Sequence, residues 1–534
     1  MRHLRQALRN PAIRRVVLAF STFNFAEWAT WTAILVYAYQ RGGATESGLI
    51  AFVMVAPAAV LAPIIATIGG RLRRERMLLV AYVVQAIVMV AAAAALFAEA
   101  PAAVVYVFAI LTSISVTFTR PAHGAILPSL ASTPDELTAA NVASGTVMNI
   151  AIASAPIVSG LILAGPGAGA VFLVSAAGVT LGAALVVTVR TEPDAVEEAP
   201  PRIGDIVDGL QVLARLRGPR TIVVLLGAAA AIEGAMDVLV IVVAIELING
   251  GAAIVGGLSS AAGVGGIIGA AAAVALVGRS RLAGPFALGL LVWGIPIGLL
   301  GIAPGLVAGV LLFLVAGAGR GALDVAGRTL LQRVTPDAAL SGAFGAVESA
   351  YMGMIAVGAI VVPLLILWFG PQAAMIVVGL WLPVIVAAMW RTLNAVDALG
   401  VVHVRELELL RAIPMFAPLA PPTIEHLSAS LVPVEMGSGA WIIREGDAGE
   451  RFYIVDEGDV EVSIEDRVVR RQGPGSSFGE IALLRDVPRT ASVRAVSTVK
   501  LLALERDVFL AAVAGHARSR TAADAVVAER LGSG

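Results

Sequence analysis

Apolar runs long enough to cross a bilayer recur almost without pause from Val16 to Trp390, and then they stop. A crossing helix needs about 20 consecutive apolar residues. Lipid offers the backbone no hydrogen-bond partners, so each crossing segment has to be a helix that pairs its own N–H and C=O groups. With 58% hydrophobic and 14% charged residues, the chain is also far more apolar than an ordinary soluble protein. These features predict a polytopic all-α membrane domain, followed after Trp390 by a segment of a different kind.

The apolar runs predict about twelve spans in two sets of six. We expect an N-terminal half at residues 1–190 and a second half at 221–391, joined by a cytoplasmic linker at 191–220. Apolar residues between 203 and 213 recur at helical spacing, which predicts a helix lying at the membrane interface within this linker. The spans are expected at residues 16–39, 47–69, 77–98, 102–126, 138–164, 168–190, 221–248, 252–277, 284–303, 305–327, 342–366 and 371–391.

Basic residues gather on one side of the predicted spans. Arginines cluster there at 71–76 and within 190–220, whereas the other side carries Arg41 and almost no other basic residue. Because cytoplasmic loops carry the excess of Lys and Arg, both termini and the C-terminal domain are expected in the cytoplasm. Lys500 is the only lysine. We read this arginine bias as that of a GC-rich bacterial genome, and the membrane as the bacterial inner (cell) membrane.

A short motif occurs in both predicted halves. Thr133-Pro134-Asp135 lies at the turn between the fourth and fifth spans, and Thr335-Pro336-Asp337 lies at the turn between the tenth and eleventh. Small residues open the next helix in each case. Matching elements in two halves are typical of transporters built from repeats.

Residues 1–391 resemble a transporter of the major facilitator superfamily, in the branch that contains bacterial siderophore and macrolide exporters. The resemblance rests on the stretch RPAHGAILP at 120–128, on Asn141 before the fifth span, and on the basic loop between the second and third spans. One feature departs from the family. The loop at 69–76 keeps the arginines of the pattern Gly-x-x-x-Asp-Arg-x-Gly-Arg-Arg but lacks the acidic residue at the matching place. The resemblance implies a small-molecule substrate and alternating access.

Few ionisable residues lie at bilayer depth, and each is a candidate functional group because an unpaired charge there is costly. The first set, Asn24, Glu27, Glu233 and Asp237, lies in the first and seventh spans, which are repeat partners. Carboxylates that are desolvated and clustered bind protons more readily, so this set predicts a proton-coupling site in a central cavity. The alternative is that these acids pair with arginines and hold helices together. A second set is predicted to form gating pairs near the cytoplasmic face: Arg120, Arg320, Asp324 and Arg328.

The chain after Trp390 predicts an α+β domain. A connector helix is expected at 392–415, followed by a domain at 416–534. Short alternating segments separated by glycines predict a small antiparallel β-roll, and the end of the chain returns to helical spacing. The glycines that mark the turns are Gly446, Gly449, Gly458 and Gly475.

Within this domain, the segment FGEIALL is followed five residues later by Thr490-Ala491. A glycine turn that opens a short helix offers unpaired backbone N–H groups to an anion. Glu480 is an acceptor suited to a ribose hydroxyl, and Arg489 supplies a charge-assisted contact to a phosphate. The residues therefore fit a ligand that has one phosphate beside a free sugar hydroxyl.

The segment resembles the phosphate-binding cassette of cyclic-nucleotide-binding domains, over about residues 407–515. The resemblance implies that Glu480 binds the ribose 2′-hydroxyl, Arg489 the cyclic phosphate, and Thr490 the phosphate or a guanine. Thr490 leaves cAMP and cGMP both open, and of the two we expect cAMP. Arg518 or Arg520 in the last helix is a candidate cover for the purine. The implied site residues are Phe478, Gly479, Glu480, Ile481, Ala482, Arg489, Thr490 and Ala491.

Together these features predict a proton-driven exporter of a small amphipathic compound, regulated by a cyclic nucleotide and present as a monomer or homodimer. The chain has no cysteine and shows no metal-ligand cluster and no nucleophile–base set, so we expect neither an enzyme nor a metal site. Nothing predicts nucleic-acid binding. Two alternatives are a membrane-anchored nucleotide sensor without transport and, less favoured, a nucleotide-gated channel, for which no filter-like loop is present.

Overall fold

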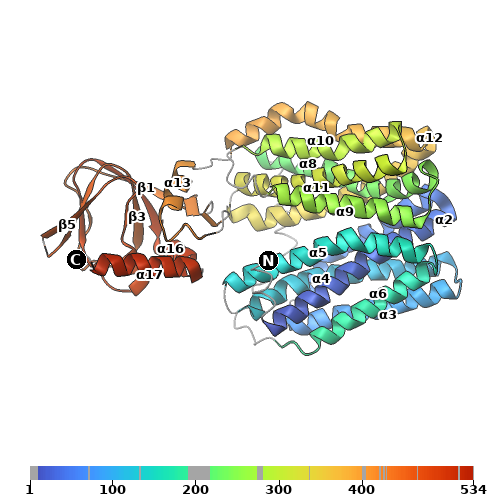
Figure 1. Cartoon of the computed structure of the whole chain (residues 1–534), viewed down its shortest axis with the longest axis horizontal. Helices are drawn as coiled ribbons and strands as arrows, with labels where there is room; N and C mark the ends of the chain where they lie inside the picture. Colours follow the sequence, from blue (N-terminus) through green and yellow to red (C-terminus); the bar gives the residue numbers. More distant parts are fainter. Residues whose placement is uncertain are drawn as a thin grey trace. The chain divides into compact units, whose positions relative to one another are not determined.

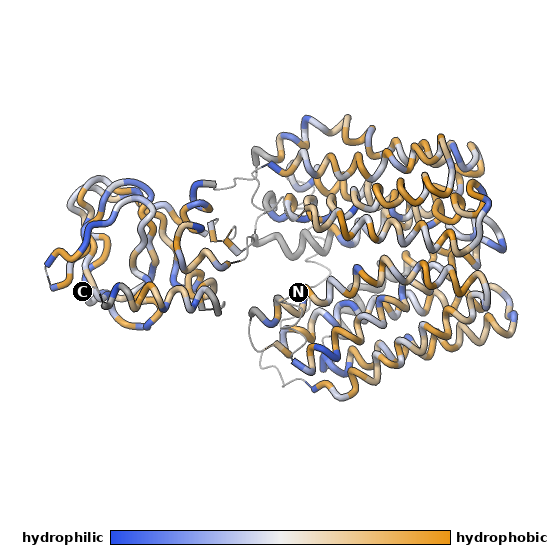
Figure 2. Tube along the Cα trace, viewed as in Figure 1, coloured by the Kyte–Doolittle hydropathy of each residue, from blue (hydrophilic) through white to orange (hydrophobic). Residues whose placement is uncertain are grey.

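The chain divides into two compact units, the first ending at Gly400 and the second beginning at Val401. A computed structural model provides the coordinates, and Figure 1 shows the helices of the first unit and the sheets of the second. Apolar residues dominate the helices of the first unit, whereas the second unit is mixed (Figure 2). The structure describes residues 10–69, 73–131, 134–190, 217–273, 281–335, 337–399, 404–419, 423–424, 427–428, 430–465, 467–514 and 517–532.

Long helices make up the first unit. They are α2 (Pro11–Gly69), α3 (Arg74–Phe97), α4 (Ala102–Leu130), α5 (Pro134–Leu163), α6 (Ala168–Val186), α8 (Arg217–Val242) with the π-helical turn η1 (Val243–Leu247), α9 (Ala252–Ala273), α10 (Ala283–Ile302), α11 (Leu306–Val334) and α12 (Asp337–Leu399).

Two of these helices contain sharp breaks. Non-helical backbone at Gly42 and Gly43 divides α2, and Gly370 divides α12. Gly43 has φ 64° and Gly370 has φ 80°, a region open to glycine without steric cost. Each break lies between two of the predicted spans. Among the described residues, 9 helices are long and apolar enough to cross a membrane. The helical membrane domain is therefore confirmed, while the count of twelve stays a prediction.

Glycines let α9 lie directly against its neighbours. A Cβ at Gly265 or Gly269 would collide with backbone of α11, and a Cβ at Gly263 would lie 2.8 Å from the Cα of Ala153 in α5. Small residues at such positions let helix backbones approach closely. In lipid the hydrophobic effect does not drive helices together, so close packing of this kind holds them.

The second unit is built on two antiparallel four-stranded sheets, ordered β1-β8-β3-β6 and β2-β7-β4-β5. Its elements are α13 (Val404–Ala412), β1 (Val432–Met436), β2 (Trp441–Ile443), β3 (Arg451–Glu457), β4 (Val460–Ile464), β5 (Arg467–Gln472), β6 (Ser477–Phe478), α15 (Glu480–Arg485), β7 (Ser492–Ala495), β8 (Val499–Glu505), α16 (Arg506–Ala514) and α17 (Ala517–Gly532). The predicted α+β architecture with a roll is confirmed.

Alternation along β8 explains why this unit has two cores. Val499 and Leu501 face the core between the sheets, whereas Leu502 and Leu504 face the core beneath the helices. In the helical core the rings of Phe452 and Phe509 stack with centroids 4.8 Å apart. The helices α13, α16 and α17 thus bury one face of the roll.

The structure divides the predicted connector at 392–415. Leu393 and Val396 are buried in the core of the first unit, while Leu407 and Leu410 are buried in the core of the second. The segment accordingly forms the end of α12 and the separate helix α13. The predicted interfacial helix within 191–220 lies outside the described residues, except that α8 begins at Arg217.

Candidate functional site

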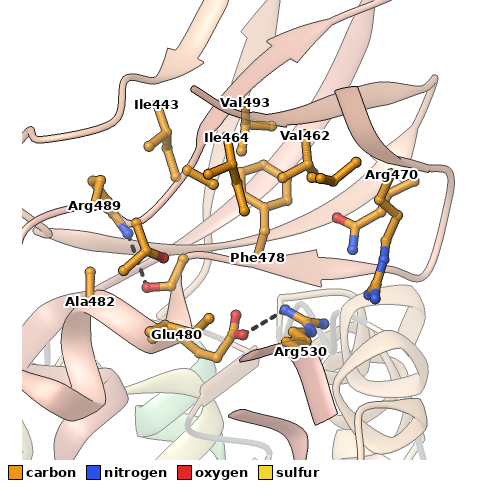
Figure 3. Close-up of a pocket in the computed structure, with 16 residues that line it drawn as sticks. Ile443, Val462, Ile464, Arg470, Phe478, Glu480, Ala482, Arg489, Val493 and Arg530 are labelled. Atoms are coloured by element: carbon orange, nitrogen blue, oxygen red, sulfur yellow. Dashed lines mark hydrogen bonds and ion pairs between the residues drawn. The ribbon is translucent and has the colours of Figure 1, made fainter. Parts of the chain in front are cut away.

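The roll encloses a cavity of about 240 Å³ (Figure 3). Strands β2, β4, β5 and β7 supply part of its lining, and the segment from β6 into α15 supplies much of the rest. Every residue predicted for the nucleotide cassette lines this cavity: Phe478, Gly479, Glu480, Ile481, Ala482, Arg489, Thr490 and Ala491. A contiguous stretch of sequence thus forms one continuous surface.

Gly479 joins β6 to α15 with φ 95°. An L-residue strains the backbone in this region. A Cβ here would also lie 2.7 Å from Nη1 of Arg489 and 3.0 Å from the carbonyl oxygen of Arg451. Glycine is therefore required both by the backbone conformation and by the guanidinium beside it.

Replacing Gly479 with alanine should displace Arg489 and weaken cAMP binding by at least about tenfold, with a loss of roughly 1–3 kcal/mol in the free energy of unfolding of this unit. Titration calorimetry and thermal melts of the purified full-length protein measure the two effects. Gly475→Ala is the matched control, because Gly475 also has positive φ but no atom near its missing Cβ and no place in the cavity lining. Equal losses of affinity in both variants would contradict the role assigned to Gly479.

Arg489 is a buried cation, 6% exposed, without a carboxylate partner among the described residues. Its guanidinium donates to the backbone carbonyl of Gly479 at 3.0 Å and to that of Arg451 at 2.7 Å. Burial lowers the pKa of Arg489, yet a guanidinium stays protonated in proteins. A positive charge fixed by carbonyls at the wall of a cavity is a site for an anion.

Glu480 is almost fully buried, at 1% exposure. Its Oε1 accepts from Nη1 of Arg530 at 2.7 Å, while its Oε2 is buried with no hydrogen-bond partner in the described structure. A buried carboxylate oxygen without a partner is costly, so Oε2 is ready to accept a hydroxyl or an N–H from a ligand.

Arg530, in α17, was missed from the sequence. It lines the cavity and holds the last helix to Glu480, whereas Arg520 is exposed and the side chain of Arg518 lies outside the described residues. Helical spacing could have indicated Arg530, because it lies on the same face of α17 as the buried Ala523 and Val527. The resemblance had pointed only to the start of the helix.

The membrane unit contains two carboxylate–arginine pairs, one in each predicted half. Glu27 of α2 pairs with Arg120 of α4 at 2.7 Å. Glu233 of α8 pairs with Arg320 of α11 and also accepts from the hydroxyl of Tyr351. The structure thus joins residues that had been predicted as two separate sets.

The other residues of those sets are not members of these two ion pairs. Asp237 accepts from the indole N–H of Trp31 at 3.2 Å, which links α8 to α2 across the predicted halves. Asn24 donates to the carbonyl of Phe20, and its Oδ1 is buried without a partner in the described structure. Asp324 lies one turn beyond Arg320 in α11. Arg328 is 3.7 Å from Glu348, with both side chains more than half exposed.

Two further hydrogen bonds join the predicted halves. Tyr39 at the end of the first span donates to Glu246 in the π-helical turn η1. The backbone N–H of Ile157 in α5 donates to Ser260 of α9 at 3.1 Å. The charge pattern predicts that the end of the first span, which carries Tyr39, lies outside the cytoplasm.

Two protein families match the chain. Residues 16–285, just over half of the chain, match the Major Facilitator Superfamily, and residues 433–516 match the cyclic nucleotide-binding domain. The second match covers the roll from Pro433 onward and all of α16, including all of the cassette.

Curated relatives resemble the C-terminal part. One is the cyclic nucleotide-gated potassium channel mll3241 of Mesorhizobium japonicum, 34% identical over 131 residues, which are 24% of this chain and 35% of the channel. Another is the cAMP-dependent protein kinase regulatory subunit of Emericella nidulans, 38% identical over 102 residues, 19% of this chain and 25% of the subunit. The chain therefore spans about a third or less of the relatives it matches. Among solved structures, the regulatory domain of Toxoplasma gondii PKA with cAMP is 36% identical over 21% of this chain and 44% of that chain, with a TM-score of 0.20.

Proposed function

The chain belongs to the Major Facilitator Superfamily, and on that premise we propose that it is a secondary active transporter regulated by a cyclic nucleotide bound in its C-terminal domain. We further propose that it is a proton-coupled exporter of a small amphipathic compound in the inner membrane of a bacterium. The siderophore and macrolide exporter branch, which the sequence around Arg120 and Asn141 resembles, supports that substrate class.

One observation carries the regulatory part of the proposal. A single cavity holds a buried cation, Arg489, and a buried carboxylate oxygen, Oε2 of Glu480, and among the described residues the first has no carboxylate partner and the second no hydrogen-bond partner. The two groups complement a phosphate and a hydroxyl on one ligand. A cyclic nucleotide carries both, and its ribose 2′-hydroxyl is free.

Of the two common cyclic nucleotides we propose cAMP. The kinase subunit that resembles residues of this domain is named as cAMP-dependent, and it shares 38% identity over the matched segment. The cassette itself, with Thr490 after Arg489, accommodates either nucleotide.

The charge pairs support the transport part. Each predicted half carries one glutamate bound to one arginine at membrane depth, and Asp237 meets Trp31 between the halves. Ionisable groups at that depth are expensive to keep unless they have a function or a partner. We propose that Glu27 and Glu233 bind and release protons as the halves move. In this proposal each carboxylate is either protonated or paired with its arginine.

Regulation requires that nucleotide binding be passed to the membrane unit. Only residues 400–403 separate α12, which ends at Leu399, from α13, which begins at Val404. Helix α13 shares its core with α16 and α17, and α17 carries the arginine that binds Glu480. A ligand hydroxyl bound to Oε2 shares the Glu480 carboxylate with the Arg530 contact at Oε1, which gives ligand binding a route to the helices packed with α13.

The absence of cysteine in the natural chain makes this proposal directly measurable. Spin labels on Ala98→Cys and Ala303→Cys, exposed residues just beyond α3 and α10, report the separation of the two predicted halves at their outer ends. We expect cAMP to change the ratio of the two conformational populations by roughly 5- to 150-fold, the usual range of allosteric coupling. Double electron–electron resonance in lipid nanodiscs gives the populations.

The same labels on an Arg489→Leu background provide the control, and cAMP should leave its populations unchanged. If cAMP binds the native protein but leaves the distance distribution as it was, the domain does not regulate the membrane unit. A distribution that is also insensitive to pH would favour the alternative, a membrane-anchored sensor that does not transport.

A further inference from the structure

The polar groups of the cavity follow an order that matches the covalent order of a nucleotide. Figure 3 shows Arg489 and Arg470 toward opposite ends of the cavity, with Glu480 between them. If the phosphate lies at Arg489 and the ribose at Glu480, the base extends toward β5. A purine joined to ribose through N9 has its 6-position on the ring farthest from the sugar, so this position faces the β5 end.

The β5 end combines apolar walls with a glutamine oxygen that has no partner within the described part of the chain. Val462, Ile464 and Val469 supply the walls. Gln472 also lines the cavity, and its Oε1 is buried with no hydrogen-bond partner in the described structure. Gln472 and Arg470 are two residues apart in regular pairing with β4, so they lie on the same face of β5.

Resting on the proposed function, we propose that Gln472 is the residue that selects the base, by accepting a hydrogen bond from the 6-amino group of adenine. A 6-amino group satisfies the buried acceptor, whereas a 6-oxo group places a second acceptor against it and leaves both without a donor. The site is therefore selective for cAMP over cyclic nucleotides with a 6-oxo purine.

Inosine 3′,5′-cyclic monophosphate is the appropriate competitor, because it differs from cAMP only at the 6-position and the adjoining ring nitrogen. Titration calorimetry on the full-length protein in detergent should show native protein binding cAMP roughly 5- to 100-fold more tightly than the inosine analogue. Gln472→Met, which keeps the side-chain length and removes the polar atoms, should bring the ratio of the two affinities close to one.

The side-chain amide of Gln472 could also face the base in the opposite orientation and donate its N–H to a 6-oxo group. Gln472→Glu tests this, because an ionised carboxylate can only accept hydrogen bonds. The added charge weakens both ligands, but the preference for cAMP should persist. Three results would each overturn the inference and leave the proposed function standing. They are loss of the preference for cAMP in Gln472→Glu, an unchanged affinity ratio in Gln472→Met, and a preference of the native protein for the inosine analogue. Failure of native protein to bind either nucleotide would overturn the proposed function itself.

Discussion

Arg489→Leu should lower the affinity of the full-length protein for cAMP by about two to three orders of magnitude. Removing one member of a buried, hydrogen-bonded charge pair costs roughly 2–5 kcal/mol, and each 1.4 kcal/mol is about a factor of ten in affinity. The native guanidinium is 6% exposed and already oriented by the carbonyls of Gly479 and Arg451, so no ordering cost opposes phosphate binding. Titration calorimetry measures the change.

The variant also removes two hydrogen bonds to carbonyls, so a structural loss must be separated from a lost ligand contact. Arg506→Leu is the matched control. Arg506 donates to the carbonyl of Gly449 at 3.0 Å and pairs with Asp486, but it does not line the cavity. Its removal should lower the melting temperature while leaving cAMP affinity within a few-fold of native. Similar affinity losses in the two variants would mean that Arg489 acts by holding the fold.

Arg489→Lys refines the same test. Lysine keeps the charge but presents a point-like ammonium in place of the planar fork that reaches both carbonyls. We expect an affinity between those of native protein and Arg489→Leu. Native affinity in the lysine variant would show that charge alone, without the fixed geometry, binds the phosphate.

The cassette could be predicted from the sequence because its chemistry is local. Gly479, Glu480 and Arg489 lie within a dozen residues, and the roll only has to fold for them to face one cavity. Arg530 escaped prediction because it lies 50 residues from Glu480 and meets it through the packing of α17. Spacing along α17 shows a buried face, but it does not show which side chain that face touches.

The membrane unit shows the same limit more strongly. The sequence identified Glu27, Arg120, Glu233 and Arg320 as charges at bilayer depth, but not which of them pair. Glu27 and Arg120 are 93 residues apart, and Glu233 and Arg320 are 87 apart. Their pairing depends on which helices are neighbours, and hydropathy carries no information on that. It does predict the helical nature of the domain, because the lipid environment imposes it on every span.

Glu27→Gln should abolish the response of the spin-label distances to pH. A double-mutant cycle with Arg120 then shows whether the response is lost because Glu27 binds the proton or because its ion pair holds two helices together. In the native protein the carboxylate of Glu27 lies 2.7 Å from the guanidinium. The single variant leaves Arg120 without its partner. Because the side chains of Arg120 and Glu27 are 39% and 20% exposed, we expect a cost below the roughly 3–5 kcal/mol of a fully buried pair. Loss of movement in this variant alone is therefore ambiguous between proton coupling and helix pairing.

The double variant Glu27→Gln/Arg120→Gln removes both charges, so neither is left unpaired. We expect the double variant to recover most of the melting temperature that Glu27→Gln loses, because the penalty for an unpaired charge is present only in the single variants. If Glu27 carries the proton, the double variant should be stable yet insensitive to pH. If the pair only holds α2 to α4, both stability and the pH response return.

The cycle on Glu233 and Arg320 tests the second half, where Tyr351 also donates to the carboxylate. A pH response that survives in both double variants would exclude Glu27 and Glu233 as the coupling groups and leave Asp237, which meets Trp31 between the halves, as the remaining candidate from the predicted set.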